Sequence, residues 1–483
     1  MIRKILFATT LLIMCIVIIS CGRRDKAETT QANILFLFAD DHSYTGVNAL
    51  GNNEIITPNL DKLVESGVTF THAYNMGAWH GAVCVASRAM LNTGRMLFRA
   101  KEAEDQHYNG FKEKRMFWSQ MMEDKGYETY ISGKWHVAEK AEDIFQTSGH
   151  IRGGMPPTVQ KSYNRPLSDT DNAWLPWDTL NGGYWEGGTH WSEVVANEAI
   201  GFLQQAQKSI KPFFMYIAFN APHDPRQSPK EYVDLYSLDN IELPPSFQEE
   251  YPYKMEMGCP PTLRDEKLAP FPRTPYSVKV HTQEYYAIIS HMDKQIGRII
   301  EELKLSGQDK NTYIIFSADH GLACGKHGLL GKQNLYDHSI RVPLIIAGPD
   351  IPENEKRDMQ VYLQDLMATT LDVAGIEKPE YVDFNSLLPL IKNKNSDSLY
   401  PEIFGSYRNH QRMVRSETHK LIFYPKAGVY RLYDIVNDPL ELNDIAAEPG
   451  NLKLIKDLAF RLQTQQTIVG DTLKLTAYYP DLF

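Results

Sequence analysis

The residues best suited to chemistry lie in the segment 81–95, which reads GAVCVASRAMLNTGR. Cys84 comes just ahead of a short segment that we predict to be helical, with Ser87 and Arg88 in its first turn and Gly94 as its stop. A helix N-terminus carries unpaired N–H groups and a partial positive charge, and Arg88 adds a full charge one turn away. Such surroundings lower the pKa of a thiol. Cys84 is therefore expected to be reactive or to be a target of modification, with a buried structural cysteine as the alternative.

Four apolar stretches of the chain end in residues that can bind a metal ion or carry a proton. These endings are Asp40-Asp41, Lys134 with His136, His223, and Asp319-His320. Apolar runs of this kind are typical of strands buried on both faces of a parallel sheet. Ligands bind outside the carboxyl ends of such strands. One polar ending alone is an ordinary solvated loop, but four at the same end of a sheet indicate a site.

The acidic members of this set predict a site for a divalent cation. Asp40, Asp41 and Asp319 offer hard oxygen ligands, which suit Ca²⁺ or Mg²⁺ better than zinc. Two adjacent acids beside a third on another strand would repel one another without a cation. Helix capping by Asp40 and Asp41 is the alternative, and Mg²⁺ or Mn²⁺ in place of Ca²⁺ stays open.

The basic members predict a pocket for an anion. The formal net charge of the chain is −10, so the protein has no long-range attraction for sulfate or phosphate and a local pocket must hold an anionic group. Arg88, Lys134 and Lys332 are the candidate cations, each of which alone would be an ordinary surface group. His136 and His223 are candidate proton carriers, because histidine titrates near neutral pH.

The segment Cys84-Val85-Ala86-Ser87-Arg88, continued by Leu91-Asn92-Thr93-Gly94-Arg95, resembles the signature of the type I, formylglycine-dependent sulfatases, among them bacterial glycan and arylsulfatases. Ala86 stands where proline is usual in that family. The resemblance covers nearly the whole chain from the Asp40-Asp41 strand onward. It implies an alkaline-phosphatase-like fold and conversion of Cys84 to formylglycine by a maturation enzyme.

The resemblance also implies roles for the site residues. The calcium ligands would be Asp40, Asp41, Asp319, His320 and modified Cys84, and the sulfate pocket would comprise Lys134, His136, His223 and Lys332. Arg88 would steady the formylglycine hydrate, one hydroxyl of which attacks sulfur. We expect His223, assisted by Lys332, to protonate the leaving oxygen, and His136 to remove the proton of the second hydroxyl.

The expected reaction is the exo-acting removal of O-sulfate from a saccharide. Candidate sugar contacts are Trp185, Glu186, His190, Asp224, Arg226, Asn409, His410 and Arg412. The tryptophans could equally cover the domain. Two other functions stay open: hydrolysis of phosphate or phosphonate esters by the same fold, and an inactive glycan-binding lipoprotein.

Residues 1–21 predict a lipoprotein signal peptide. Arg3 and Lys4 precede an apolar run over 5–19, which is short for a membrane span of roughly 20 residues and has the layout of a secretory signal. Ile18-Ile19-Ser20-Cys21 resembles a bacterial lipobox, so we expect Cys21 to be lipidated and the protein to be anchored in the cell envelope, facing the periplasm. A plain signal peptide or a membrane anchor is the alternative.

The 483 residues exceed one ordinary core and predict two domains. Strands alternate with helices over 22–395, which predicts a doubly wound, mostly parallel α/β sheet flanked by helices. Residues 396–483 predict a smaller α+β subdomain with a small antiparallel sheet and a closing helix. Nothing in the composition indicates nucleic-acid binding. Cys259 and Cys324 remain as a possible disulfide pair.

Overall fold

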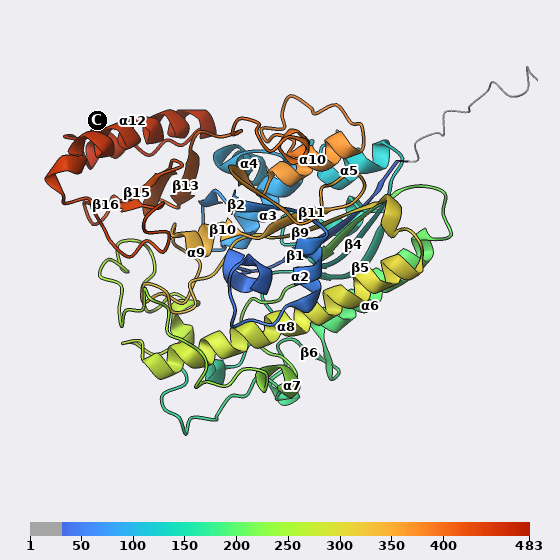
Figure 1. The fold of residues 1–483 in the computed structure, drawn as a ribbon, viewed down its shortest axis with the longest axis horizontal. Coiled ribbons are helices and arrows are strands. Elements are labelled where there is room, and N and C mark those ends of the chain that lie inside the picture. The colour runs from blue at the N-terminus through green and yellow to red at the C-terminus, as the bar shows by residue number, and fades with distance from the viewer. Residues whose placement is uncertain (1–30) are drawn as a thin grey trace, which may run out of the picture.

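A nine-stranded mixed sheet forms the centre of residues 31–483, the part of the chain that the computed structural model describes (Figure 1). The strands are, in spatial order, β10 (Arg341–Val342), β2 (Gly67–Tyr74), β11 (Leu344–Ala347), β9 (Thr312–Ala318), β1 (Asn33–Ala39), β8 (Phe213–Ala218), β4 (Glu128–Lys134) and β5 (Thr147–Arg152), with β12 (Glu355–Tyr362) pairing with β2 outside this path. The neighbours β9, β1, β8 and β4 are parallel to one another. Their residues are almost entirely buried, which explains their apolar sequences.

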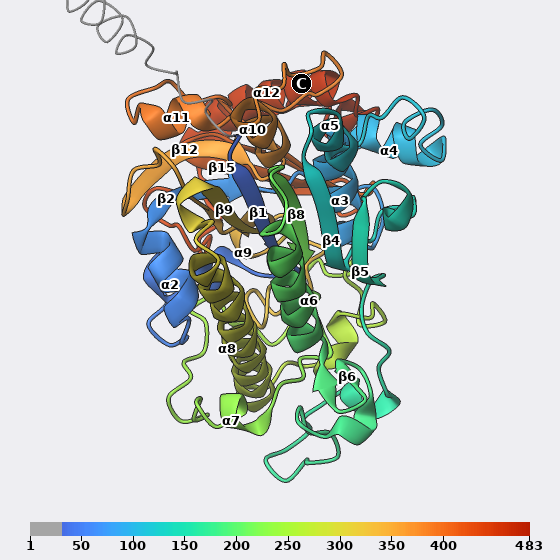
Figure 2. The ribbon, with the colours of Figure 1, turned by 90° about the vertical axis from the view of Figure 1, so that its right-hand side faces the viewer.

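Helices cover both faces of the sheet, as Figures 1 and 2 show. One layer contains α2 (Pro58–Glu65), α6 (Trp191–Ala206), α7 (Lys230–Val233) and α8 (Pro275–Leu305). The other contains α3 (Val83–Thr93), α4 (Leu97–Asp105), α5 (Trp118–Asp124) and α10 (Asp365–Val373). The short helix α9 (Asp337–Ile340) lies between β9 and β10 in the chain, and α11 (Leu388–Lys392) lies between α10 and the C-terminal part.

A second sheet lies beside the first and is closed by α12 (Leu452–Val469) (Figure 1). Its order is β16 (Val429–Asp434), β15 (His419–Tyr424), β14 (Gln411–Arg415), β13 (Ile403–Tyr407) and β3 (Gly77–Ala78). The four C-terminal strands are antiparallel, whereas β3 runs parallel to β13. Gly77 has a φ of +89°, and a Cβ there would lie 2.0 Å from the Ser406 carbonyl oxygen. Only glycine at this position therefore lets β3 approach β13. The second sheet thus reaches the chain just ahead of Cys84.

The predicted fold class is confirmed, with differences in detail. The run 341–347 forms two strands, β10 and β11, separated at Pro343, because proline cannot donate to the ladder. Strands β5 and β12 were not predicted. The division of the chain into two domains at residue 395 stays a prediction. Strand β3 belongs to the C-terminal sheet although it precedes residue 395 in the sequence. Among residues 31–483, no helix has both the length and the apolar composition that crossing a membrane requires. The predicted signal peptide and Cys21 lie outside the described residues.

Candidate active site

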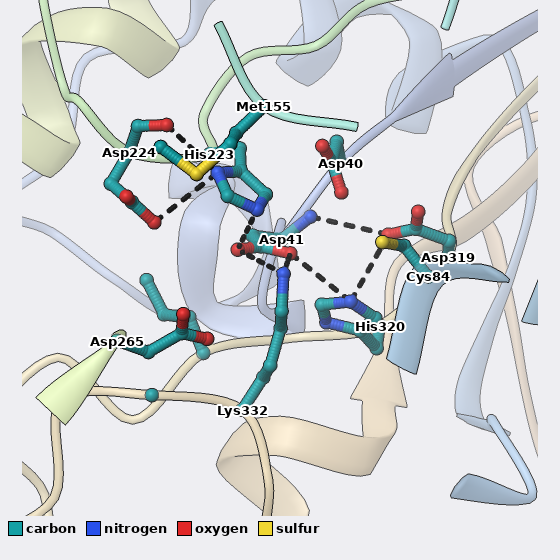
Figure 3. Close-up of polar contacts among 12 residues, drawn as sticks. Asp40, Asp41, Cys84, Met155, His223, Asp224, Asp265, Asp319, His320 and Lys332 are labelled. Carbon is teal, nitrogen blue, oxygen red and sulfur yellow. Dashed lines mark hydrogen bonds and ion pairs between the residues drawn. The ribbon is translucent and has the colours of Figure 1, made fainter. Parts of the chain in front are cut away.

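The four polar strand endings meet at one edge of the main sheet. Asp40 and Asp41 follow β1, Lys134 ends β4, His223 follows β8 and Asp319-His320 follow β9. Because β9, β1, β8 and β4 are neighbouring parallel strands, their carboxyl ends share this edge. Figure 3 shows the side chains at the ends of β1, β8 and β9 turned toward one another. This convergence is what the strand endings predicted.

Cys84 reaches the same edge from the first turn of α3. It is the second residue of the helix, not just ahead of it, and α3 ends at Gly94 in the left-handed conformation with a φ of 68°. The side chain is buried, and Sγ lies 3.3 Å from Nδ1 of His136. Burial alone would raise the pKa of the Cys84 thiol, but the charges of Lys134 and Lys332 bring it below its usual value. Cys84 is therefore an activated side chain facing a site.

Each buried carboxylate is paired with a cation. Lys134 forms an ion pair with Asp40. The ammonium of Lys332 lies 2.8 and 2.9 Å from the two carboxylate oxygens of Asp41 (Figure 3). Burial raises the pKa of Asp40 well above its usual value, and it raises that of Asp41 to about 7 despite Lys332. The two acids therefore sit in a site that disfavours their negative charges.

Asp319 is held by Arg88. Nε of Arg88 donates to Oδ2 of Asp319 at 2.9 Å, and its Nη1 donates to the Lys134 carbonyl at 2.6 Å. Burial opposes ionisation of Asp319, but Arg88 and His320 bring its pKa well below the usual range. Arg88 therefore joins the end of β4 to the end of β9, and it lies against the Phe38 ring at 4.7 Å.

The acids and His320 fit a divalent cation. Two groups of potential ligands have their donor atoms within 4.8 Å of one another, namely Asp40 with Cys84, Asp319 and His320, and Asp40 with Asp41 and His223. Oδ1 of Asp40 and Nε2 of His320 are buried without a hydrogen-bond partner among the described residues. Such orphaned acceptors are expected where an ion completes the site. The second group includes His223, which the sequence had assigned to the sulfate pocket and to proton transfer but not to the metal.

Two residues of the site hold strained backbone conformations. Asp41 has a φ of 66° and His136 a φ of 55°, values that residues other than glycine rarely adopt. The Asp41 N–H donates to Oδ1 of Asp319 at 3.2 Å, which fixes the first of these. Strain of this kind gathers at functional sites, where the surrounding structure holds it.

A pocket of about 370 Å³ opens onto Cys84. It is lined by Gly81, Ala82, Cys84, His136, Gly154, Met155, His223, Leu263, Arg264, Asp265, Lys332 and Gln333. Arg264 is a member that the sequence did not predict. Its Nη1 lies 2.8 Å from Oδ2 of Asp224, and its Nη2 lies 3.4 Å from Nε2 of His223. A third of its side chain is exposed, so it presents positive charge at the rim.

Comparison with known proteins identifies this arrangement. The family model described as Sulfatase matches residues 32–376. The chain belongs to the sulfatase family. A second model, described as N-sulphoglucosamine sulphohydrolase, C-terminal, matches residues 325–468. The predicted family and the prediction of a sulfatase enzyme are thereby confirmed.

The sulfatase is similar to three known proteins in sequence or in fold. The N-acetylglucosamine-6-O-sulfatase of Bacteroides thetaiotaomicron is 25% identical over an alignment that covers 92% of this chain and 88% of that protein. A protein solved in complex with its substrate D-glucosamine-2-N,6-O-disulfate has a TM-score of 0.71 and 22% identity, covering 92% of this chain and 99% of that one. A phosphonate monoester hydrolase from Silicibacter pomeroyi has a TM-score of 0.71 and 18% identity, covering 92% and 96%.

Several predicted sugar contacts of the sulfatase are buried against internal partners. Nε2 of His190 donates to the Gln227 carbonyl at 3.0 Å, and Nδ1 accepts the Ser192 N–H, so His190 caps α6. Arg226 is buried and contacts the His281 ring at 3.1 Å. Arg412 is buried and lies 2.8 Å from Asp471. The structure therefore gives these three side chains internal partners, and their contact with a sugar stays a prediction.

The remaining predicted contacts lie apart from the Cys84 pocket or behind it. Asp224 is buried beside His223, whose Nδ1 donates to the Asp224 carbonyl at 2.8 Å. Asn409 is exposed and His410 half-buried, and neither lines the pocket. Trp185 and Glu186 line a separate pocket. Of these five residues, Asp224 alone contacts a residue of the Cys84 pocket through its side chain.

The two other described cysteines of the sulfatase do not pair. Cys259 and Cys324 are both free and buried. The Cys259 thiol donates to the Gln333 carbonyl at 3.1 Å, whereas Cys324 packs beside α8. A disulfide between them is therefore excluded in this fold.

Proposed function

We propose that this sulfatase removes O-sulfate from a saccharide, acting on a terminal sugar that enters the Cys84 pocket. The observation that carries the proposal is the position of Cys84, whose Sγ faces a histidine 3.3 Å away inside a pocket that Lys332 and Arg264 also line. The relatives named for N-acetylglucosamine 6-sulfate and glucosamine disulfate support a sulfated hexosamine as the first sugar to test.

We further propose that Cys84 is converted to formylglycine by a maturation enzyme. The Cys84–Arg88 motif and the first-turn position of Cys84 support this. A hydrated aldehyde supplies an oxygen nucleophile that can later leave with the sulfate and return the aldehyde, which a thiolate cannot do. The Cys84 Sγ marks where that oxygen would lie.

Asp40, Asp41, Asp319 and His320, with the group at position 84, would hold the cation, which we propose to be Ca²⁺ because carboxylate oxygens dominate the set. When bound, a divalent ion supplies positive charge to the sulfate oxygens. Asp40 and Asp319 keep their carboxylates aimed at one point, because Lys134 and Arg88 hold them.

The remaining residues bind the anion and move protons. Lys134 and Lys332 place two ammonium groups beside the reacting centre, where positive charge stabilises developing negative charge. His136 is within reach of a proton on the group at position 84. His223 faces the pocket with Nε2 while Nδ1 is held by the Asp224 carbonyl, so it is oriented to protonate the leaving oxygen.

Phosphonate or phosphate ester hydrolysis is the second candidate, supported by the similar fold of a phosphonate monoester hydrolase. Relative rates on an aryl sulfate, an aryl phosphate, a phosphonate monoester and glucosamine 6-sulfate separate the two. We expect the highest kcat/KM on the sulfated sugar. A phosphorus ester preferred over every sulfate would reassign the enzyme.

The modification is tested by mass analysis of the peptide that contains residue 84. We expect an aldehyde at position 84 in active enzyme, and loss of turnover in Cys84→Ala with an unchanged melting temperature. Cys324→Ala, which alters a buried cysteine that does not line the Cys84 pocket, is the matched control and should stay active. Active enzyme with an intact Cys84 thiol would refute the modification.

We also propose that the chain is lipidated at Cys21 and anchored in a bacterial cell envelope, on the strength of the lipobox-like segment 18–21. Membrane fractionation of wild type and Cys21→Ser in a bacterial host tests this. Release of the variant from the membrane fraction is expected, and an unlipidated wild-type chain would contradict it.

A further inference from the structure

A second pocket, of about 330 Å³, lies next to the Cys84 pocket. It is lined by Arg152, Pro157, Thr158, Val159, Asn181, Gly182, Gly183, Trp185, Glu186 and Trp191. Its walls are the segment after β5, the turn at 181–183, the hairpin of β6 (Trp185–Glu186) with β7 (Thr189–His190), and the start of α6. Figure 2 shows the chain running from β5 toward this hairpin at the end of the molecule. None of its lining residues belongs to the Cys84 pocket.

Register and chain connectivity place the two pockets side by side. Arg152 pairs with Lys134, the residue that contacts Asp40, so their backbones lie about 4.8 Å apart on adjacent strands. Gly154 lines the Cys84 pocket and is two residues from Arg152, a span of at most about 7 Å. A ligand that occupies one pocket can therefore extend past this segment into the other.

Arg152 is a largely buried cation, and not all of its N–H groups have a hydrogen-bond acceptor among the described residues. Its side chain is only 10% exposed, and its guanidinium stacks on the Trp191 ring at 3.9 Å. Nη2 lies 2.8 Å from Oε2 of Glu186, while Nε is buried without a partner among the described residues. The stack and the burial fix the guanidinium in place, and a fixed fork of N–H groups matches a carboxylate or sulfate.

Glu186 is the group that an anionic ligand would replace. Its side chain is 55% exposed, in contrast to that of Arg152, so it can turn toward solvent without disturbing the pocket. An ion pair with such an exposed carboxylate is weak. The pocket therefore holds a buried cation behind a carboxylate that can be displaced.

Trp185 supplies a flat wall. Its Nε1 donates to the Pro176 carbonyl at 3.1 Å, and its ring meets the His190 ring edge to face at 5.3 Å. The indole is thus fixed, and its half-buried face is available to the apolar C–H face of a pyranose ring. The volume lies within the range of small-ligand sites.

We propose that this pocket is a subsite for the sugar residue next to the sulfated one, with Trp185 under the ring and Arg152 bound to a negative group on it, a carboxylate or a second sulfate. The substrate class is then an anionic oligosaccharide and not a simple sulfate ester. The proposal rests on the proposed function, since it needs a sulfated sugar in the Cys84 pocket.

The test compares substrates that differ only at the neighbouring sugar. We would measure kcat and KM on an aryl sulfate and on three disaccharides with the same sulfated terminal sugar, whose neighbouring residue is neutral, carries a carboxylate or carries a sulfate. In Arg152→Gln, the ratio of kcat/KM on an anionic disaccharide to that on the aryl sulfate should fall at least tenfold through KM. The arm with the larger fall identifies the group as carboxylate or sulfate.

Two further variants complete the test. Glu186 is exposed, so Glu186→Gln should fold like wild type. It should lower KM for the anionic disaccharides at least threefold, because the carboxylate that competes for Arg152 is gone. Arg461→Gln is the matched control, because it removes an exposed arginine of α12 that pairs with Glu402. It should leave all ratios of kcat/KM unchanged. Ratios unmoved by Arg152→Gln, or KM unmoved by Glu186→Gln, would overturn the subsite.

Failure of the proposed function is distinguishable from failure of the subsite. If wild type hydrolyses no sulfate ester, the subsite is judged by calorimetric binding of the same disaccharides to the full chain. Binding of an anionic disaccharide that Arg152→Gln weakens at least tenfold supports it. Equal binding to both proteins, or no binding, overturns it.

Discussion

His136 Nδ1 and Cys84 Sγ lie 3.3 Å apart, and the position of the His136 ring depends on a glycine. A Cβ at Gly154 would lie 2.9 Å from Cε1 of His136, closer than real Cβ contacts come. The backbone at Gly154 therefore packs directly against the imidazole ring of His136, on which Nδ1 faces position 84. Because residue 154 has no side chain, the His136 ring has room to lie beside Cys84.

Gly154→Ala should displace the His136 ring and lower kcat at least tenfold. The melting temperature should change little, since the ring can turn aside into the open pocket. A Cβ at the adjacent Gly153 would meet no atom within 4 Å, so Gly153→Ala is the matched control and should keep kcat within twofold. Steady-state kinetics on an aryl sulfate measure both. Equal kcat in the two variants would show that the ring position does not matter.

Calcium should stabilise the sulfatase against heat. Asp40 Oδ1 and His320 Nε2 are buried without a hydrogen-bond partner among the described residues, and His320 Nε2 faces the Asp41 carboxylate at 3.1 Å, so an ion that binds these groups stabilises the folded state alone. At a calcium concentration 100 times the Kd, the gain is about 2.7 kcal/mol. Differential scanning fluorimetry with chelator and with added Ca²⁺ measures the rise in melting temperature, and Mg²⁺ and Mn²⁺ titrations test the choice of ion.

Asp319→Asn should abolish this calcium response. Asp293→Asn is the matched control, because Asp293 is a buried carboxylate outside the site that accepts the Leu60 N–H at 2.7 Å at the start of α2. It should lower the melting temperature by itself and keep the calcium-dependent rise. A calcium response that survives in Asp319→Asn would place the ion elsewhere.

Arg264→Gln should lower kcat/KM at least tenfold. Arg264 reaches both Asp224 and His223, so its loss removes a pocket cation and frees the His223 ring. Arg264→Lys should recover part of the activity, because lysine keeps the charge but not the fork of N–H groups. Michaelis–Menten kinetics on a sulfated sugar give the result. A Gln variant with wild-type kcat/KM would remove Arg264 from the site.

The sequence predicted the parts of the site that lie on buried parallel strands. The strands β1, β8 and β9 read as apolar runs because both of their faces are covered, and each run stops where the polar residues begin. Asp40, His223 and Asp319 could be found from this pattern alone. The family motif was needed for the conversion of Cys84 to formylglycine and for Lys332, which lies in a loop.

Other parts carried no such pattern. Strand β5 reads TSGHIR and is only partly buried, so it lacks the apolar signature of a strand. Arg264 lies in the irregular stretch 243–274, where no periodicity locates a side chain. His190 looks like a polar contact in sequence but caps α6, and only its burial distinguishes the two roles. Tertiary packing decides each case.

His327 should make the stability of the protein sensitive to acid. Its ring stacks on Tyr336 at 4.1 Å, and Nε2 donates to the Glu441 carbonyl at 3.0 Å. Burial lowers its pKa from 6.5 to about 4, although the Glu441 carbonyl opposes the shift. Between these values the unfolded chain binds a proton that the folded chain does not. The free energy of unfolding therefore falls as pH drops from about 6.5 to about 4, by up to about 1.4 kcal/mol per pH unit for this group.

His327→Phe should keep the stack on Tyr336 and remove this proton. Loss of the hydrogen bond to Glu441 should destabilise the variant by about 1 kcal/mol at pH 7.5. Because wild type alone loses stability in acid, this difference should vanish below pH 6.5, and the variant should be the more stable protein at about pH 4.5. Urea unfolding followed by tryptophan fluorescence at pH 7.5, 6.5, 5.5 and about 4.5 gives the slopes. His107→Asn alters an exposed histidine and should leave the wild-type slope in place. Parallel curves for wild type and His327→Phe would mean that His327 takes up its proton equally in the folded and unfolded chains.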